Sequence, residues 1–591
     1  MKLISRSPAG LVAALAAVSL GACSSSSDDP NQPAEPTVQL EITPASVTFG
    51  EDRSRAVELA NTGDEAAGPV ELVALAVTDA GGNEVPGASL SVSPSEVATL
   101  NAGDSRALTL TLDVPGSVGS GDYDFDLEAR VGGEAAASLG TSFSVVQDPG
   151  PVIETLEITG GAPQARQGEV LSFAVSATDD QGQPVNDPMV TWRAEPAFAG
   201  LTTAGGEYVG YSVGTARIIA EAGGAADTVE VDVTSRDAPS GSFQVAWHEP
   251  VELRYTSDHW EHGDVAYTGT WGCRAVPGGQ CGNTLYVWDI TVRTAPVLTD
   301  SIQVDARVVN DVKVRADGTL AIITHESSND GLNGITLLDL TDPLQPTVIT
   351  RFAAPDLSPG VHNVWIEGDY AYLVVDGAVP SSGLRVLDIS DPANPLIVAS
   401  FYGGGSFLHD VYVRDGLAFL SHWTTGLIIL DVGNGVAGGS PTSPVEVSRI
   451  AVPGYDVHNA WYWPEAGYVF LGDEIAVPGR VLVIDVNDLS APTQVASFTL
   501  AGAAPHNFWV DEDAGIAYFS WYENGIHAVD VSGRLLGELD KQARQVASIQ
   551  YDVGGACIAP SGTCSWAPQL HDGLIYVSDL NSGLWVLQPT F

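Results

Sequence analysis

The chain has 591 residues and a formal net charge of −50, with 74 Asp and Glu against 24 Lys and Arg. Such an acidic surface repels nucleic acid, so we expect no nucleic-acid partner. Hydrophobic residues make up 44% of the chain, which excludes a disordered protein, and 64 Gly with 36 Pro predict an all-β protein rich in turns.

The N-terminus has the layout of a secretory leader. Lys2 and Arg6 precede an apolar run over residues 11–20, which is too short to span a membrane. Residues 1–22 are therefore predicted to be a signal peptide.

The leader ends in Leu-Gly-Ala-Cys at residues 20–23, which resembles the lipobox of bacterial lipoproteins. The resemblance implies that Cys23 is lipidated and anchors the chain in a membrane. The Ser24 that follows implies the outer membrane, with the protein in the periplasm or on the surface. An ordinary cleaved signal with a stray cysteine is the alternative. Residues 23–37, rich in Ser and Pro, are predicted to be a flexible tether.

Two β-sandwich modules are expected next. Residues 38–147 contain short alternating stretches between turns, which is typical of an Ig-like β-sandwich. Alternation over residues 122–126, Asp-Tyr-Asp-Phe-Asp, predicts a strand with its carboxylates in solvent, and not a cation-binding loop. In residues 151–236, Val-Thr-Trp at 190–192 and the strands at 214–218 and 227–233 resemble the bacterial Ig-like (BIG2-type) domain, which implies a spacer or adhesion module.

Four cysteines remain beyond the leader, and they form two close pairs, Cys273 with Cys281 and Cys557 with Cys564. In an exported protein the expectation is two local disulfides. A zinc site is the alternative, although neither pair has the Cys-x-x-Cys spacing. Four cysteines allow three connectivities, and the sequence alone does not choose among them.

A repeated unit occupies residues 243–591. Its clearest part is an apolar strand that contains an Asp, as in Leu-Tyr-Val-Trp-Asp-Ile at residues 285–290, and successive aspartates lie 50, 49, 43, 54 and 45 residues apart. The six aspartates are Asp289, Asp339, Asp388, Asp431, Asp485 and Asp530. Several copies continue into Asp-Pro-x-x-Pro, as at residues 342–346 and 391–395. This region resembles the LVIVD-repeat family of exported β-propellers, in its anchored subgroup, and the resemblance implies the propeller fold.

We count seven blades of four strands in this region. The last blade stops at Phe591 after its third strand, while residues 243–247, Phe-Gln-Val-Ala-Trp, lie before the first blade without a partner. We therefore expect a seven-bladed β-propeller closed by this N-terminal strand, which leaves no open sheet edge. The expected architecture is two Ig-like β-sandwich modules followed by that propeller.

All eleven histidines lie in the propeller. His362, His409, His458 and His506 hold one repeat position, 47, 49 and 48 residues apart, and an Asn or Asp follows each. Because this position opens the innermost strand, we expect the four imidazoles to surround one mouth of the central channel. Turns on the same face should add His325, Glu326, His422, Trp423, Asp473, Glu474, Trp521, Tyr522 and Glu523.

Three interpretations of the repeated histidines stay open. They are a packing device between blades, the polar rim of a ligand site, or ligands for a transition metal such as Zn, Fe or Cu. The last is similar to the four axial histidines of carotenoid-cleaving oxygenase propellers. Among the aromatic residues, Trp423, Trp521 and Tyr522 are candidates for stacking on a sugar, whereas those of the innermost strands, such as Trp365, are expected in the packing between blades.

No Gly-x-Ser-x-Gly, phosphate loop or His-Glu-x-x-His occurs in the chain, so we assign no catalytic residue and no firm cofactor. The sequence therefore favours a binding or interaction module for a surface protein or a polysaccharide. The alternative is a metal-dependent enzyme, similar to an oxidase or oxygenase, with Glu326 or Glu474 as a possible acid or base.

Overall fold

A computed structural model describes residues 2–4, 37–49, 53–79, 85, 88–114, 118, 121–146, 152–237, 240–377, 381–475, 478–552, 556–559 and 561–591. The chain divides into two compact units, Met1–Glu154 with Asp179–Val185, and Thr155–Thr178 with Asn186–Phe591. Cys23 and the predicted tether up to residue 36 lie outside the described residues. In the described part of the chain, no helix is long and apolar enough to cross a membrane.

The first unit contains two sheets that pack against each other. One has the order β1-β11-β10-β5-β8, with β3 beside β11 and β6 beside β10, and the other has the order β2-β4-β9-β7. Their strands are β1 (Lys2–Ile4), β2 (Leu40–Thr43), β3 (Ser46–Phe49), β4 (Ser54–Asn61), β5 (Val70–Ala74), β6 (Thr78–Asp79), β7 (Ser89–Ser93), β8 (Glu96–Val97), β9 (Ser105–Asp113), β10 (Gly121–Val131) and β11 (Glu134–Val146).

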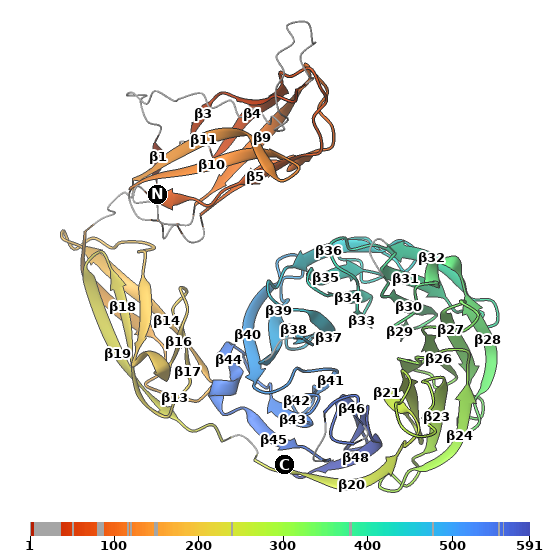
Figure 1. Ribbon diagram of the computed structural model, residues 1–591. Coiled ribbons are helices and arrows are strands. Elements are labelled where there is room, and N and C mark those ends of the chain that lie inside the picture. Colours follow the sequence, from red (N-terminus) through yellow and green to blue (C-terminus); the bar gives the residue numbers. More distant parts are fainter. Residues whose placement is uncertain are drawn as a thin grey trace, which may run out of the picture. The chain divides into compact units, whose positions relative to one another are not determined.

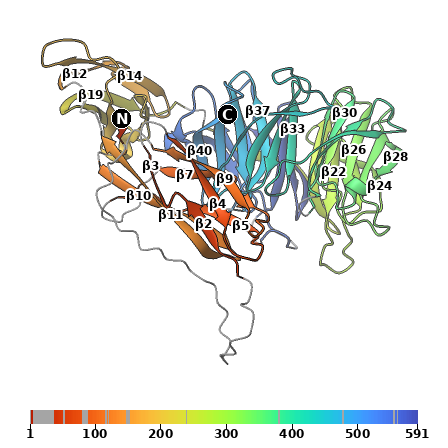
Figure 2. The same ribbon diagram turned by 90° about the horizontal axis from the view of Figure 1, so that it is seen from above.

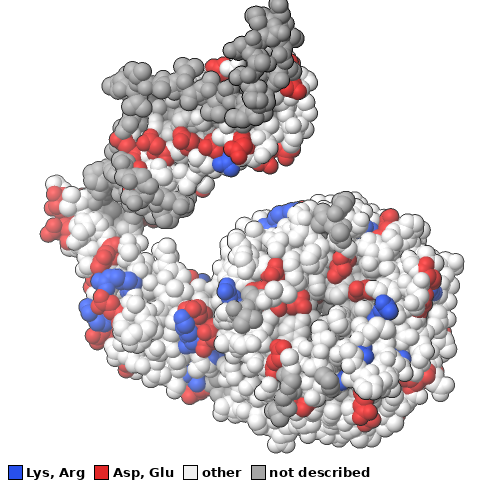
Figure 3. All heavy atoms as spheres, in the orientation of Figure 1, with Lys and Arg blue, Asp and Glu red and all other residues white. Residues whose placement is uncertain are grey.

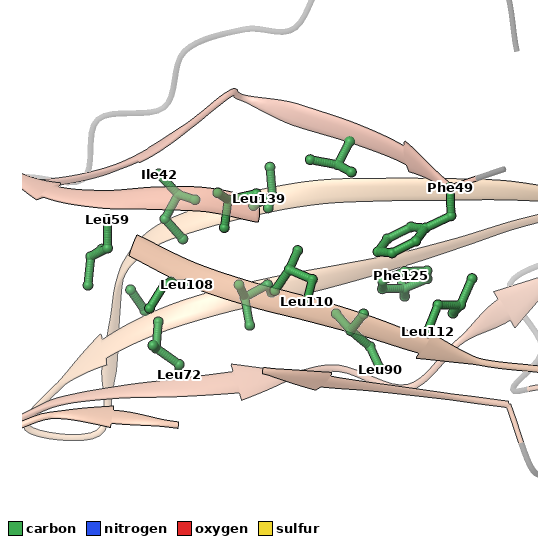
Figure 4. Close-up of a cluster of buried hydrophobic side chains, with 14 of the residues drawn as sticks. Ile42, Phe49, Leu59, Leu72, Leu90, Leu108, Leu110, Leu112, Phe125 and Leu139 are labelled. Atoms are coloured by element: carbon green, nitrogen blue, oxygen red, sulfur yellow. The ribbon is translucent and has the colours of Figure 1, made fainter. Parts of the chain in front are cut away.

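Apolar side chains from both sheets fill the space between them, among them Leu59, Leu110 and Phe125 (Figure 4). Along β10 buried and exposed residues alternate, so that Tyr123 and Phe125 face this core while the carboxylates between them face solvent. The prediction of a strand over residues 122–126 is therefore confirmed.

A second pair of sheets follows, with the orders β12-β14-β17-β16 and β13-β19-β18-β15. Their elements are β12 (Ile153–Gly160), β13 (Gln164–Arg166), β14 (Val170–Asp179), β15 (Thr191–Glu195), the 3-10 helix Ala197–Ala199, β16 (Gly200–Thr202), β17 (Glu207–Gly210), β18 (Gly214–Ala222) and β19 (Ala225–Thr234). Trp192 on β15 lies opposite Ala220 on β18. The strands predicted at 214–218 and 227–233 lie within β18 and β19.

From Phe243 on, the described residues form successive four-stranded sheets around a common centre (Figure 1), which Figure 2 shows edge-on. The sheets are β21–β24, β25–β28, β29–β32, β33–β36, β37–β40 with β44, β41-β42-β43-β45, and β46-β47-β48-β20. This is a β-propeller architecture.

The strands of these sheets have the following bounds. They are β20 (Phe243–Pro250), β21 (Tyr255–His262), β22 (Val265–Trp271), β23 (Thr284–Asp289), β24 (Val297–Gln303), β25 (Val312–Val314), β26 (Leu320–His325), β27 (Gly334–Asp339), β28 (Thr347–Ala353), β29 (Val364–Glu367), β30 (Tyr370–Val375), β31 (Gly383–Asp388), β32 (Leu396–Phe401), β33 (Asp410–Arg414), β34 (Leu417–His422), β35 (Gly426–Asp431), β36 (Val445–Ile450), β37 (Val457–Trp463), β38 (Tyr468–Asp473), β39 (Gly479–Asp485), β40 (Thr493–Leu500), β41 (Phe508–Asp511), β42 (Ile516–Ser520), β43 (Ile526–Asp530), β44 (Gly537–Glu538), β45 (Gln545–Ile549), β46 (Ser565–His571), β47 (Leu574–Asp579) and β48 (Gly583–Pro589). The 3-10 helices Pro355–Leu357 and Leu539–Gln542 lie in connections.

The last sheet joins the two ends of this region. Phe243 on β20 lies opposite Pro589 on β48, and Val245 lies opposite Leu587. The strand predicted at residues 243–247 therefore does pair with the final strand of the chain. The Phe243 ring is buried and contacts the ring of Phe591, with the centroids 5.7 Å apart.

The repeated aspartates end the third strand of six sheets, and turn chemistry explains why they recur. Each carboxylate accepts a hydrogen bond of 2.7 to 2.9 Å from the backbone N–H two residues later. Asp forms such turns readily because its short side chain reaches the following backbone. The repeat seen in the sequence is thus a repeat of one strand-ending turn.

Two disulfides link Cys273 to Cys281 and Cys557 to Cys564. The expectation of two local pairs is confirmed, and the alternative of a zinc site made by these cysteines is wrong, because each sulfur is already bonded to another sulfur.

Candidate functional site

The innermost strands place three layers of side chains along the channel. In the sheet β29–β32, His362 lies at the mouth, Asn363 follows it, and Trp365 lies two residues beyond Asn363. Residues two apart share one side of a strand, so Asn363 and Trp365 both face the channel, about 7 Å apart along it.

The same layers recur in the neighbouring sheets. We call them the histidine layer, the polar layer and the aromatic layer. The histidine layer contains Asn310, His362, His409, His458, His506 and Trp566. The polar layer contains Asp258, Asp311, Asn363, Asp410, Asn459 and Asn507. The aromatic layer contains Trp260, Lys313, Trp365, Tyr412, Trp461 and Trp509.

The four repeated histidines are direct neighbours in the histidine layer. Ring centroids lie 4.6 Å apart for His362 and His409, 4.6 Å for His409 and His458, and 4.1 Å for His458 and His506. Because each comes from a different sheet, the packing of neighbouring sheets brings them together.

Glu474, in the turn after β38, joins two of these histidines. Its Oε2 atom lies 3.9 Å from Nε2 of His409 and 3.8 Å from Nε2 of His458. Its other oxygen, Oε1, accepts a hydrogen bond of 2.6 Å from the hydroxyl of Tyr522. The Nδ1 atoms of His409 and His458 are buried and have no hydrogen-bond partner among the described residues.

His362 differs from the other three histidines. Its Nδ1 lies 2.7 Å from Oε1 of Glu326 and 3.7 Å from Oδ2 of Asp376. Burial lowers the pKa of His362, but the two carboxylates raise it by more, to about 9. Burial in turn raises the pKa of Asp376 to about 6. His362 is therefore an imidazolium at neutral pH.

His409, His458 and His506 are neutral. Burial, together with the neighbouring histidines, holds the pKa of His409 and of His506 well below the usual range. Burial also lowers the pKa of His458. His506 donates from Nδ1 to the carbonyl of Trp566 at 2.7 Å, which leaves the lone pair on Nε2. Neutral imidazole is the form that binds metals.

Two groups of these side chains could hold a metal ion. They are His362 with Asp376 and His409, and His409 with His458 and Glu474, and in each group the ligand atoms lie within 4.8 Å of one another. Neither group contains His506. A tetrahedral zinc with bonds of 2.0 to 2.1 Å separates two ligand atoms by about 3.4 Å. In the second group, Oε2 of Glu474 lies 3.9 and 3.8 Å from the two histidine nitrogens, so these side chains would have to move closer together to bind one ion.

Four of the residues expected on this face lie inside the sheets. His325 is fully buried and bonded to Thr336, and His422 and Asp473 are buried at the ends of their strands. Trp521 is fully buried, and its indole donates to the carbonyl of Ala503 at 2.8 Å. Its ring is therefore not available for stacking on a ligand, because the core surrounds it.

The other expected residues are partly exposed. Glu326 and Glu474 contact histidines as described, whereas Glu523 accepts a hydrogen bond from the backbone of Cys557. Trp423 lies 5.0 Å from His409 between ring centroids. Trp423 and Tyr522 have φ angles of 34° and 37°, which is unusual for non-glycine residues and frequent at functional sites. Figure 3 shows acidic side chains gathered around the centre of the ring on the face that it draws.

The sequence pattern predicted packing between blades for the aromatic residues of the innermost strands, but it did not predict that they form a layer along the channel. Five aromatic rings form a closed circuit, with centroid distances between 4.5 and 6.1 Å, in the order Trp260, Trp365, Tyr412, Trp461, Trp509 and back to Trp260. They pack between blades as expected, but they also line a channel cavity of about 70 Å³. The signal in the sequence is an aromatic residue three positions after each repeated histidine.

A comparison with protein families agrees with the repeat. The model of the LVIVD repeat matches residues 360–402 and 408–452. No curated protein matches the chain. A crystal structure of the C-terminal WD40 domain of Sif2 is similar to 74% of this chain and 99% of that chain, with 13% identity and a TM-score of 0.38. With the ring of four-stranded sheets, the repeat match makes this chain a β-propeller protein that carries LVIVD repeats.

Proposed function

We propose that the chain is an exported lipoprotein of the outer membrane. A signal peptide over residues 1–22, lipidation at Cys23 and a tether to residue 37 would hold it in the membrane. Two Ig-like modules, the second of the BIG2 type, would then separate the membrane from a seven-bladed propeller. This proposal is supported by the leader, by the lipobox-like residues 20–23 and by the order of the sheets along the chain.

The propeller, in this proposal, binds a divalent transition metal at the mouth of its channel. His409, His458 and Glu474 would provide the ligands, with His506 and the His362–Asp376 pair beside them. The observation that supports the metal most is the carboxylate of Glu474, which faces Nε2 of both neutral histidines at 3.8 and 3.9 Å. Imidazole and carboxylate together suit Zn, Fe and Cu.

The full chain, purified without chelator, tests the proposal by elemental analysis and by titration with Co²⁺. Wild-type protein should contain metal near one equivalent, and bound Co²⁺ should give a visible absorption band. His409→Ala and His458→Ala should each lose both signals, because each removes one ligand of a three-ligand site.

A matched control is His571→Ala, at the far end of its strand, which should retain the metal. Wild-type protein without metal, and without a Co²⁺ band after titration, would overturn the metal site. It would also remove the oxidase- or oxygenase-like alternative, which requires that site. Contact with a surface protein or a polysaccharide stays a prediction about the same face.

A further inference from the structure

We propose that the channel also binds a primary ammonium group of an organic ligand, in the part of its cavity lined by Asp410, Asn459 and Asn507. Tyr412, Trp461 and Trp509 of the aromatic layer would surround the alkyl chain. This site is separate from the histidine layer and does not depend on a metal.

Lys313 shows how the channel accommodates an ammonium. Its Nζ lies 3.2 Å from Oδ2 of Asp258, hydrogen-bonds to Asp311, and lies 5.0 Å from the ring centre of Trp260. Two carboxylates of the polar layer and one indole of the aromatic layer thus surround a buried cation. A cation over an indole face within about 6 Å is attracted by the ring quadrupole.

The opposite half of the channel repeats these chemical groups without a lysine. Oδ1 of Asp410 accepts hydrogen bonds from Nδ2 of Asn363 and from the backbone of Val411, at 2.8 and 2.7 Å. No described residue donates to its Oδ2. Three Asp, Lys313 and His259 face this cavity. Burial, together with Asp311, raises the pKa of Asp410 to about 7, and a cation bound beside this carboxyl would stabilise its charged form.

Two amides supply further acceptors. Oδ1 of Asn459 and Oδ1 of Asn507 are buried and have no hydrogen-bond partner among the described residues. Rotation of an amide by 180° turns either its oxygen or its nitrogen toward a ligand. An ammonium has three N–H donors, which matches one carboxylate oxygen and two amide oxygens.

The aromatic layer sets the size and shape of the ligand. A cavity of about 70 Å³ has room for several groups of the size of water, and so for an ammonium with a short unbranched chain. Trp461 is held in place by its indole, which donates to Oε1 of Glu512 at 3.0 Å. The same carboxylate is paired with Arg414 at 2.5 Å. The wall of the site is therefore rigid on this side.

Calorimetry and tryptophan fluorescence with three probes test the site on the full chain. The probes are n-butylammonium, Nα-acetyl-lysine methylamide and tetramethylammonium. We expect saturable binding of n-butylammonium with a dissociation constant of about 1 mM or lower, and quenching or shift of the fluorescence. Equal binding of the lysine derivative would identify a protein side chain as the source of the ammonium, and its exclusion would identify a free amine.

Asp410→Asn should weaken the binding of n-butylammonium at least tenfold, because it removes the charge that an ammonium pairs with. Trp509→Leu should weaken it several-fold through loss of the indole face, and this second variant keeps the test valid if the first fails to fold. Asp513→Asn, on an exposed turn, is the matched control and should bind as the wild type does.

Three results would overturn the proposal. They are no saturable binding of n-butylammonium by the wild type, unchanged binding by both cavity variants, or equally tight binding of tetramethylammonium, which cannot donate hydrogen bonds. Metal content is measured on the same samples. Amine binding by a wild-type protein that contains no metal would therefore contradict only the proposed function. Metal in a wild-type protein that binds no amine would contradict only this inference.

Discussion

The hydroxyl of Tyr522 donates to Oε1 of Glu474 at 2.6 Å, and this bond directs the other carboxylate oxygen, Oε2, toward His409 and His458. Tyr522 adopts a positive φ angle of 37° in the same turn. A residue with a strained backbone thus orients a proposed metal ligand through this hydrogen bond. Hydrogen-bond partners of metal ligands commonly have this role.

Tyr522→Phe is expected to weaken metal binding by about 10- to 100-fold, because Glu474 loses the hydrogen bond that fixes its orientation. Competition between the protein and a chromophoric chelator for Zn²⁺ measures this effect. Tyr402→Phe, which changes an exposed hydroxyl, should leave the affinity unchanged. An unaltered affinity in Tyr522→Phe would show that the tyrosine does not position the carboxylate.

From the buried pair of His259 and Glu261 we expect the protein to lose stability at alkaline pH. Its Nδ1 lies 2.8 Å from Oε1 of Glu261 and its Nε2 lies 2.8 Å from the carbonyl of Ala567, so both nitrogens face acceptors and the ring is protonated. Burial lowers the pKa of His259, but the Glu261 carboxylate raises it by more, so the net direction is upward.

The pKa of His259 is higher in the folded protein than its value of about 6.5 in the unfolded chain, so protonation of this ring stabilises the fold. This contribution is fully present below about pH 6.5. This contribution is lost as the pH rises through the folded-state pKa. Urea unfolding between about pH 6 and pH 9 should thus show a steeper decline of the free energy of unfolding in the wild type than in His259→Gln. Glu261→Gln should flatten the decline in the same way. Parallel curves for wild type and His259→Gln would contradict the ion pair.

Phe243→Ala is expected to destabilise the propeller by about 3 kcal/mol, which is typical of a buried Phe truncated to Ala. The ring is 7% exposed and packs on Phe591 and Tyr518 at the junction of the two chain ends. Denaturant unfolding measures the change. Val245→Ala on the same strand, where the side chain is 45% exposed, should cost less than about 0.5 kcal/mol. Equal effects of the two variants would mean that β20 does not seal the ring.

Replacement of both Cys557 and Cys564 by Ala should lower the free energy of unfolding by about 2 to 3 kcal/mol, because the bond closes a loop with a sequence separation of 7 in the unfolded chain. Denaturant unfolding with and without reductant checks this. Reductant should have a smaller effect on the double variant than on the wild type. An equal effect on both would indicate that the two cysteines are not bonded.

Local features of the sequence predicted most of the fold. Asp388 and the other repeated aspartates mark strand ends because each bonds a backbone N–H only two residues away. The short separation of each cysteine pair favoured the local disulfides. Residues 243–247 had no partner in the first blade and the last blade lacked one strand, so the count of strands predicted that these two ends pair. These inferences depend on neighbours in the chain or on counting, so they needed no coordinates.

The candidate site was only partly predictable. The spacing of the histidines placed His409 and His458 in one layer, but it treated all four alike. Their different protonation depends on Glu326, Asp376 and Glu474, which reach the mouth from turns of different sheets. Trp521 follows its strand in the same way as Trp423 does, yet it is fully buried, because packing around it and not local spacing determines exposure.

The sequence by itself therefore determined the strands, the repeat, the closing strand and the repeated channel positions, since these follow from local turn chemistry and periodicity. Only the tertiary structure decided which side chains meet across the channel. Packing of neighbouring sheets brings Glu474 to His409 as well as to His458 of its own sheet, and closure of the ring joins five aromatic rings into a circuit. Contacts between residues tens to hundreds of positions apart depend on the curvature and closure of the whole ring, which no single repeat encodes.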